Sequence, residues 1–239
     1  MSENNTFDTL MLLARPAAGK SEIIHYLHNT PLEERIKRFH IGEFIEIDDF
    51  PMLWAWFEED RILEEMGMKR LHSTKEEEFN DQRLWDVLIR RICLEHQKLS
   101  RDIEGSPTIV VEFSRGSEHG GYESAFQNLS EDVLKQLAIL YVDVSWEESL
   151  RKNRKRFNPD RPDSILEHAL PDERLERLYK EIDWEKVTAD DPDFIQVQGA
   201  EVPYVVLDNQ DDVTTARGEE LGNRLEEALN DLWTLYSNN

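Results

Sequence analysis

Short apolar runs alternate along this chain with longer amphipathic segments, and this alternation constrains the fold more than any other feature. The runs lie at residues 9–14, 42–47, 108–113, 137–144 and 203–207, and all but the second are nearly continuous. Such runs are typical of parallel strands that are covered on both faces. Strands that alternate with helices favour right-handed crossovers. The pattern therefore predicts a three-layer α/β fold.

The segments between these runs have helical character. Apolar residues recur with helical spacing over 79–99 and from about residue 215 onward, and another helix is expected at 19–27. Ser145 and Glu148 have the spacing of a capping box, which predicts a helix that runs into the basic segment after it.

Two connections are much longer than the others. Residues 50–104 join the second and third runs, and residues 145–202 join the fourth and fifth. Because both are helical in pattern, we expect excursions over the ligand-binding edge of the sheet, one on the substrate side and one that acts as a lid. The whole chain, 1–239, is expected to form one domain.

Composition excludes several classes of protein. The chain of 239 residues is 39% hydrophobic and has a net charge of −23, which argues against a nucleic-acid or anionic-membrane binder. No apolar stretch is long enough to span a bilayer. A single cysteine, Cys93, cannot form an intramolecular disulfide, so a cytoplasmic location is expected. The composition does not decide whether the protein forms a homodimer.

The strongest motif is ARPAAGKSE at residues 14–22, between the first run and the first expected helix. Its end matches the phosphate-binding pattern G-x-x-x-x-G-K-[ST], while Ala14 replaces the first glycine. Small residues let the backbone approach phosphate oxygens, and a helix N-terminus attracts anions. Lys20 is expected to reach the β- and γ-phosphates and Ser21 to ligate Mg²⁺. The expected nucleotide-binding residues of this loop are Ala17, Ala18, Gly19, Lys20 and Ser21.

Acidic residues follow the second run and end the third, where parallel sheets collect their ligands. Asp48 and Asp49 directly follow the second run, and Glu112 lies in the third run, three residues before Arg115. One carboxylate is expected to be a general base, and Asp49 and Glu112 to ligate Mg²⁺. Arg115 is expected to bind an anionic group of the substrate. The structural alternatives are a helix N-cap at one aspartate and a buried Glu112–Arg115 ion pair.

A basic segment contrasts with the acidic chain. Residues 151–161 hold six Lys or Arg and one Asp. Residues 151, 154 and 155 share one helical face, so Arg151 and Arg154 are expected to stabilise a transferring phosphoryl group, and Arg156 to bind the nucleotide. A solvated helix with charge pairs is the alternative. The aromatic run at 52–57 fits either a pocket for a planar substrate or the core of a helix.

The motifs ARPAAGKSE, IDDFP, VEFSRG and ILYVDVSWEESLRKNRKR together resemble the P-loop nucleoside and nucleotide kinases, and also uncharacterised bacterial P-loop proteins with PAAGKSE- and EFSRG-like motifs. The resemblance implies a P-loop NTPase fold with a five-stranded parallel sheet in the order 2-3-1-4-5. It also implies lid arginines that grip donor phosphates, an aspartate at 48 or 49 that prepares the acceptor hydroxyl, and an adenine seat near Asn209.

We therefore expect a phosphotransferase that uses ATP and Mg²⁺. Its partner would be a small acceptor that carries a hydroxyl or phosphate group, such as a nucleoside or a nucleotide, although a sugar or an amino alcohol is equally open. Which of Asp48, Asp49 and Glu112 is the base is undecided. The alternative is a nucleotide-binding regulator of the same fold, in which a triphosphate orders the lid without turnover.

Overall fold

A six-stranded sheet forms the centre of the molecule in the computed structural model, which describes residues 5–156, 160 and 169–238. The strands run in the order β2-β3-β1-β4-β6-β5, and every neighbouring pair is parallel except β5 and β6. Their bounds are β1 Thr9–Ala14, β2 Phe44–Asp48, β3 Thr108–Phe113, β4 Leu137–Asp143, β5 Phe194–Val197 and β6 Ala200–Asp208.

The expected five-stranded parallel sheet is wrong in strand count and at one edge. The four residues of β5 pair antiparallel with β6 and form the outer strand there. Gln198 and Gly199 connect the two strands, and both have positive φ, at 52° and 86°. A tight turn of this kind returns the chain directly, so β6 and β5 make a hairpin instead of a helical crossover.

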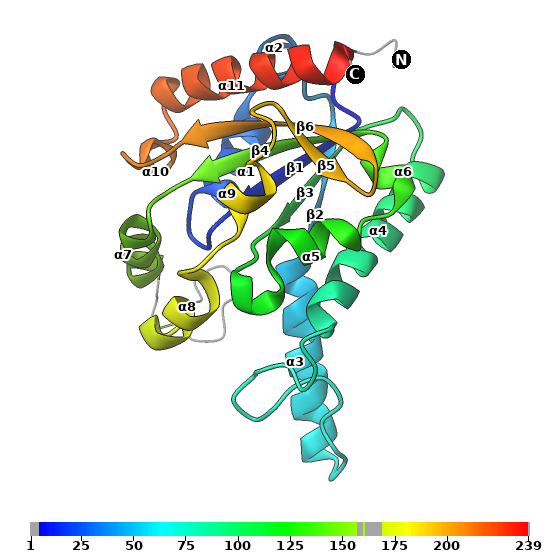
Figure 1. Ribbon diagram of the computed structural model, residues 1–239, viewed down its shortest axis with the longest axis vertical. Helices are drawn as coiled ribbons and strands as arrows, with labels where there is room; N and C mark the ends of the chain where they lie inside the picture. The colour runs from blue at the N-terminus through cyan, green and yellow to red at the C-terminus, as the bar shows by residue number, and fades with distance from the viewer. Residues whose placement is uncertain (1–4, 157–159, 161–168, 239) are drawn as a thin grey trace.

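Helices cover both faces of the sheet, which is therefore the middle of three layers (Figure 1). Alternate residues of β1 point to opposite faces: Leu10 and Leu12 belong to one buried cluster, and Met11 and Leu13 to the other. The first cluster is completed by α1 Lys20–Asn29, α2 Leu32–Phe39 and α11 Glu219–Asn238. The second is completed by α4 Leu84–Asp102, α5 Gly121–Gln127, α6 Glu131–Leu134 and α9 Trp184–Val187.

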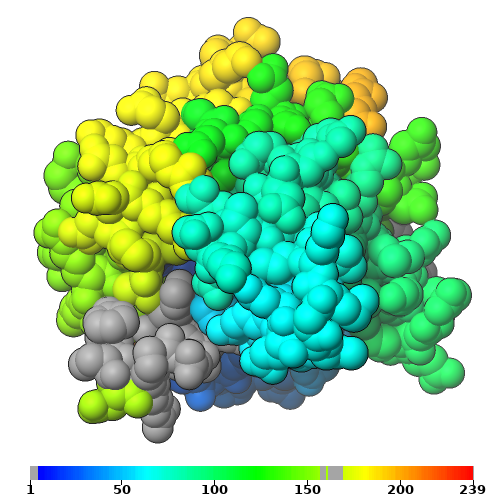
Figure 2. Space-filling model, turned by 90° about the horizontal axis from the view of Figure 1, so that it is seen from below, coloured from blue at the N-terminus to red at the C-terminus, as the bar shows by residue number. Residues whose placement is uncertain are grey.

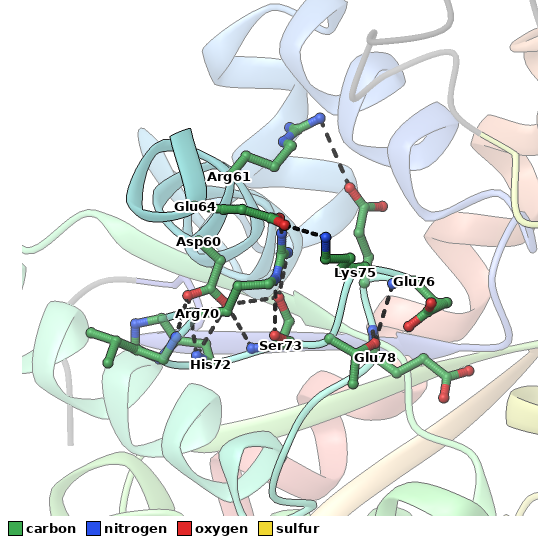
Figure 3. A network of polar contacts seen from close by, with 12 residues as sticks. Asp60, Arg61, Glu64, Arg70, His72, Ser73, Lys75, Glu76 and Glu78 are labelled. Atoms are coloured by element: carbon green, nitrogen blue, oxygen red, sulfur yellow. Dashed lines mark hydrogen bonds and ion pairs between the residues drawn. The ribbon is translucent and has the colours of Figure 1, made fainter. Parts of the chain in front are cut away.

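The substrate-side excursion consists of α3 Asp49–Glu65, a loop at 66–83 and then α4. In Figure 1, α3 extends away from the sheet. Asp60 anchors the returning loop, because its carboxylate accepts hydrogen bonds from the backbone of Leu71, His72 and Ser73 and from the Ser73 hydroxyl (Figure 3). Burial raises the pKa of Asp60, but these hydrogen bonds outweigh it and hold the pKa below its ordinary value.

The lid-side excursion contains α7 Trp146–Arg156, α8 Asp172–Tyr179, α9 and β5; residues 157–159 and 161–168 of the predicted lid lie outside the described residues. Arg174 of α8 donates to the backbone oxygens of Glu76 and Glu77 in the loop at 66–83. Figure 2 shows the two excursions in contact when the molecule is seen from below. Two short elements complete the helices of the described residues: the 3₁₀ helix Ser117–His119 and α10 Val213–Ala216.

No helix among the described residues is both long enough and apolar enough to cross a membrane.

Candidate functional site

The loop between β1 and α1 turns sharply at Gly19, where φ is 109°. A Cβ at this position would also lie 2.4 Å from Thr214 Oγ1. Both the backbone conformation and the close approach therefore require glycine. The unmatched Ala14 creates no strain, because it is the buried last residue of β1 and its φ is not positive. Ala17, with φ at 58°, is the left-handed alanine of the loop.

Three side chains bind the loop's carbonyl groups from the protein side. Tyr122 Oη donates to the carbonyl of Ala14 over 3.1 Å, Ser149 Oγ to that of Pro16 over 2.8 Å, and Asn209 Nδ2 to that of Ala18 over 2.8 Å. The first-turn N–H groups of α1 have no intrahelical acceptor, and no side chain caps this helix within the described chain. Fixed carbonyls and unsatisfied N–H groups at a helix start make a preorganised anion site.

A cavity of about 570 Å³ adjoins this loop, a volume typical of small-molecule sites. It is bounded by the loop, the carboxyl ends of β2 and β3, the inner face of α7 and the segment after β6. The predicted site residues that line it are Ala17, Ala18, Gly19, Lys20, Ser21, Asp48, Asp49, Glu112, Arg115 and Arg156. Lys20 Nζ donates to Ser114 Oγ over 2.9 Å at the edge of this space.

Asp48 and Glu112 are cross-strand neighbours in the pairing of β2 with β3. Burial, followed by the charges of Glu112 and Asp49, raises the pKa of Asp48 to about 7, although the Phe50 N–H and Lys20 oppose the shift. Burial also raises the pKa of Glu112, against the charge of Lys20. Two carboxyl groups this close cannot both ionise easily, so one of them can hold a proton near neutral pH.

Asp49, and not Glu112, is the ion-pair partner of Arg115. Its Oδ2 lies 2.6 Å from Arg115 Nη1, and the two side chains are only 8% and 2% exposed. The Arg115 guanidinium also lies 5.1 Å from the ring centres of Trp85 and Phe113. The alternative of a Glu112–Arg115 pair is therefore wrong, and Asp49 is neutralised by a buried arginine. This ion pair leaves Asp48 and Glu112 as the carboxyl groups that can exchange protons or bind a cation.

The basic helix α7 presents a different face from the expected one. Arg151 pairs with Glu148 and Asp212, and Arg154 pairs with Asp172, so neither guanidinium lines the cavity. The cavity is lined instead by Lys152, Lys155 and Arg156.

Lys152 is buried, with its Nζ 2.7 Å from Asp212 Oδ1 and 3.1 Å from Thr214 Oγ1. The sequence does not mark Lys152, because the basic segment shows which residues share a helical face but has no apolar stripe to show which face turns inward. Asn209, the expected adenine contact, is also fully buried and supports the loop from behind. Ser114 lies within the VEFSRG motif, but the sequence did not assign it a role.

Within the ranges described, no group of three or more His, Cys, Asp or Glu side chains is placed to hold a metal ion. Asp48 and Glu112 supply two carboxyl groups, and Ser21 supplies a hydroxyl on the same cavity. Mg²⁺ at nucleotide sites usually takes one or two carboxylates together with phosphate oxygens and waters. This donor set therefore fits a magnesium ion that arrives with a triphosphate.

The aromatic run at 52–57 belongs to a helix core, and part of it also lines a cavity. Leu53, Trp54, Trp56 and Phe57 are buried in a cluster with Phe79, which is the core of the substrate-side excursion. Three of them, Leu53, Trp54 and Phe57, also line a second and smaller cavity of about 80 Å³.

Comparison with protein-family models found no match for this chain, and comparison with curated proteins found none.

Proposed function

We propose that this protein is a P-loop phosphotransferase, which transfers the terminal phosphoryl group of Mg²⁺-ATP to a hydroxyl group of a small acceptor. The observation that carries the proposal is a juxtaposition on one cavity. The uncapped start of α1 and Lys20 face the same space as the Asp48–Glu112 pair. An anion site beside a carboxyl group with a pKa of about 7 is what transfer to a hydroxyl requires.

The triphosphate binds to the N–H groups at the start of α1, with Lys20 on the β- and γ-phosphates. Lys155 and Arg156 supply the positive charge from α7, in place of Arg151 and Arg154. The segment after β6, which contributes Asp212, Thr215 and Arg217 to the cavity, bounds its nucleoside end.

Ser21 and Glu112 hold Mg²⁺ in this proposal, while Asp49 stays paired with Arg115. The metal neutralises charge on the phosphate oxygens. Asp48 accepts the proton of the acceptor hydroxyl. The hydroxyl oxygen forms a bond to the γ-phosphorus, the bond from that phosphorus to the β–γ bridging oxygen breaks, and ADP leaves with the electron pair.

The test is phosphoryl transfer from γ-labelled ATP with Mg²⁺ to nucleosides, nucleotides, sugars and amino alcohols. Two arginines of α7 provide a matched pair: Arg156 lines the cavity, and Arg154 is bound to Asp172 outside it. Arg156→Ala should lower kcat by about tenfold or more, because it removes charge from the transferring group, whereas Arg154→Ala should leave kcat within about twofold.

Equal loss in both α7 variants, or full activity in Lys20→Ala, would contradict the proposed site. Binding of Mg²⁺-ATP without transfer to any acceptor would instead favour the regulatory alternative.

A further inference from the structure

Arg15 is the second residue of the ARPAAGKSE motif, and the proposed reaction assigns it no role. Residues 16–22, which follow it in the loop and in α1, all line the large cavity, whereas Arg15 is absent from the lining formed by the described residues. Its guanidinium is directed instead at backbone carbonyls of two other segments. Arg15 therefore contacts protein and not the phosphate-binding space.

The two carbonyls belong to opposite ends of the helical pair α7 and α8. Arg15 Nη1 donates to the oxygen of Val144 over 3.2 Å, and Nη2 donates to that of Lys180 over 3.2 Å. Val144 lies between β4 and α7, whereas Lys180 directly follows α8. A cation at the carboxyl end of α8 also meets the negative end of the helix dipole. The chain thus enters α7 and leaves α8 beside the same side chain.

α7 and α8 are also joined to each other. They lie side by side (Figure 1). The buried Asn153 of α7 donates from Nδ2 to the oxygen of Leu170 over 2.8 Å, and its Oδ1 accepts from the N–H of Leu170 over 3.2 Å. Leu170 lies two residues before α8. This pair of hydrogen bonds makes the position of α7 depend on that of α8, and Arg15 holds the outer ends of both.

The neighbour of Arg15 holds the inward face of α7. The buried hydroxyl of Ser149 donates to the oxygen of Pro16 over 2.8 Å. Two adjacent residues of the loop therefore fix α7, one at its start and one along its side. Lys155 and Arg156, which line the cavity, lie about two turns further along the helix. A small rotation at the start of α7 would displace these two cations by a larger distance.

We propose that Arg15 is a positioning residue for phosphoryl transfer, which keeps α7 at the distance and rotation that place Lys155 and Arg156 on the cavity. This inference rests on the proposed function and adds the contact that orients its α7 cations. Charge that stabilises a transferring phosphoryl group must be preorganised, and a displacement of about 1 Å can cost about 10²-fold in rate. Arg15 therefore affects kcat through α7, without touching the nucleotide.

The kinetic test is a double-mutant cycle between Arg15 and Arg156. Arg15→Met removes both hydrogen bonds and should lower kcat about tenfold, while the KM for Mg²⁺-ATP changes less than about threefold, because the loop and Lys20 still bind the ground state. In the Arg156→Ala background the same change should lower kcat less than about threefold, since the cation that Arg15 positions is gone. A purely structural role would give the same loss in both backgrounds.

Two further variants calibrate the cycle. Arg15→Lys keeps the charge, but one ammonium group cannot bridge two carbonyls as the planar guanidinium does, so kcat should fall by an intermediate factor of about three. Arg90→Met is the control. Arg90 lies on α4, where its Nε donates to Asn128 Oδ1 over 2.9 Å, and its loss should change kcat less than about twofold.

Hydrogen–deuterium exchange of the nucleotide-free protein gives a readout that needs no acceptor. Arg15→Met should raise the exchange rate of the α7 amides by about threefold or more, because local opening of α7 becomes easier, and should leave α4 unchanged. Arg90→Met should leave the α7 amides unchanged.

The outcomes separate the two proposals. A loss of kcat that is equal in both backgrounds, an unchanged kcat in Arg15→Met, or unchanged exchange in α7 overturns the role of Arg15 even if the enzyme turns over. If thermal unfolding shows that Arg15→Met does not fold, the same cycle with Arg15→Lys decides between additivity and its absence. Failure of the wild type to phosphorylate any acceptor overturns the proposed function, and the exchange rates then still decide whether Arg15 holds α7.

Discussion

Asp48 and Asp49 are neighbours in the sequence, yet they lie in opposite electrostatic environments. Asp48 faces another carboxyl group, Glu112, and burial with that neighbouring charge raises its pKa to about 7. Asp49 faces Arg115 at 2.6 Å in a buried ion pair. Asp48 is the last residue of β2 and Asp49 the first of α3, so the change of element sends the two side chains to different partners.

The difference separates a residue that can take part in catalysis, Asp48, from one that stabilises the fold, Asp49. The Asp48 carboxyl group, whose pKa burial raises to about 7, can take a proton from a substrate, whereas the Asp49 carboxyl group is held by a buried guanidinium. The Asp49–Arg115 pair instead fixes Trp85 and joins the start of α3 to the end of β3. The comparison predicts that changes at Asp48 affect turnover and that changes at Arg115 affect folding.

The largest effect is expected on turnover from Asp48→Asn. Loss of a general base should lower kcat by about 10²- to 10⁴-fold. The fold should survive, because Asp48 caps α3 by accepting from Phe50 N–H, and asparagine caps a helix equally well. Steady-state kinetics with the best acceptor provide the measurement.

The wild-type pH profile is the control for this assignment. Its kcat/KM should rise as the pH rises through about 7, where Asp48 loses its proton, and then level off. An unchanged kcat in Asp48→Asn would transfer the role of base to Glu112.

The next largest effect is expected on stability from Arg115→Met. This change leaves the Asp49 carboxylate buried without its partner, which typically costs about 3–5 kcal/mol. Urea denaturation of the two proteins measures the difference in the free energy of unfolding. The double variant Asp49→Leu, Arg115→Met should regain most of that loss, since an apolar pair needs no compensating charge. A loss below about 1 kcal/mol in the single variant would mean that the pair is not buried as described.

The smallest effect is the pH dependence of stability at Asp48. Its folded-state pKa of about 7 lies above the ordinary value, so the stability that its protonated form contributes at low pH is lost as the pH rises through about 7. Asp48→Asn should therefore be more stable than wild type at pH 8, and the gap should narrow toward pH 5.5. We expect a gap on the order of 1 kcal/mol, reduced by solvent screening because the side chain is partly exposed.

Thermal unfolding at the two pH values measures this gap. If the difference in stability between Asp48→Asn and wild type instead increases toward low pH, then the raised pKa belongs to a group other than Asp48.

The sequence predicted the central strands well, because short continuous apolar runs are typical of parallel strands that are covered on both faces. β1 and β3 begin and end at the predicted residues. β5 was missed, since its four residues, Phe194–Val197, are too short and too mixed to give a periodic signal. Helical spacing likewise predicted α4 and α11, and the capping box predicted the start of α7, each to within about five residues.

The sequence predicted the parts of the candidate site that are formed by adjacent residues. It missed the parts that depend on the rotation of a helix about its axis or on the pairing of distant strands. The loop that ends at Lys20 is formed by adjacent residues, so the sequence alone predicts it. The rotation of α7 does not, because its buried residues are the polar Ser149, Lys152 and Asn153, which no hydrophobic pattern marks. The Asp49–Arg115 pair joins residues far apart in the chain, and the pairing of β2 with β3 decides it.

Triphosphate binding at the loop between β1 and α1 underlies every proposed step, and thermal unfolding with and without Mg²⁺-ATP tests it most directly. At about 100 times its Kd, a ligand adds about 2.7 kcal/mol of stability, which should raise the Tm of wild type by about 5 °C or more. Lys20→Ala should show little or no shift. No shift in wild type with Mg²⁺-ATP or Mg²⁺-GTP, or an equal shift in Lys20→Ala, would contradict the account.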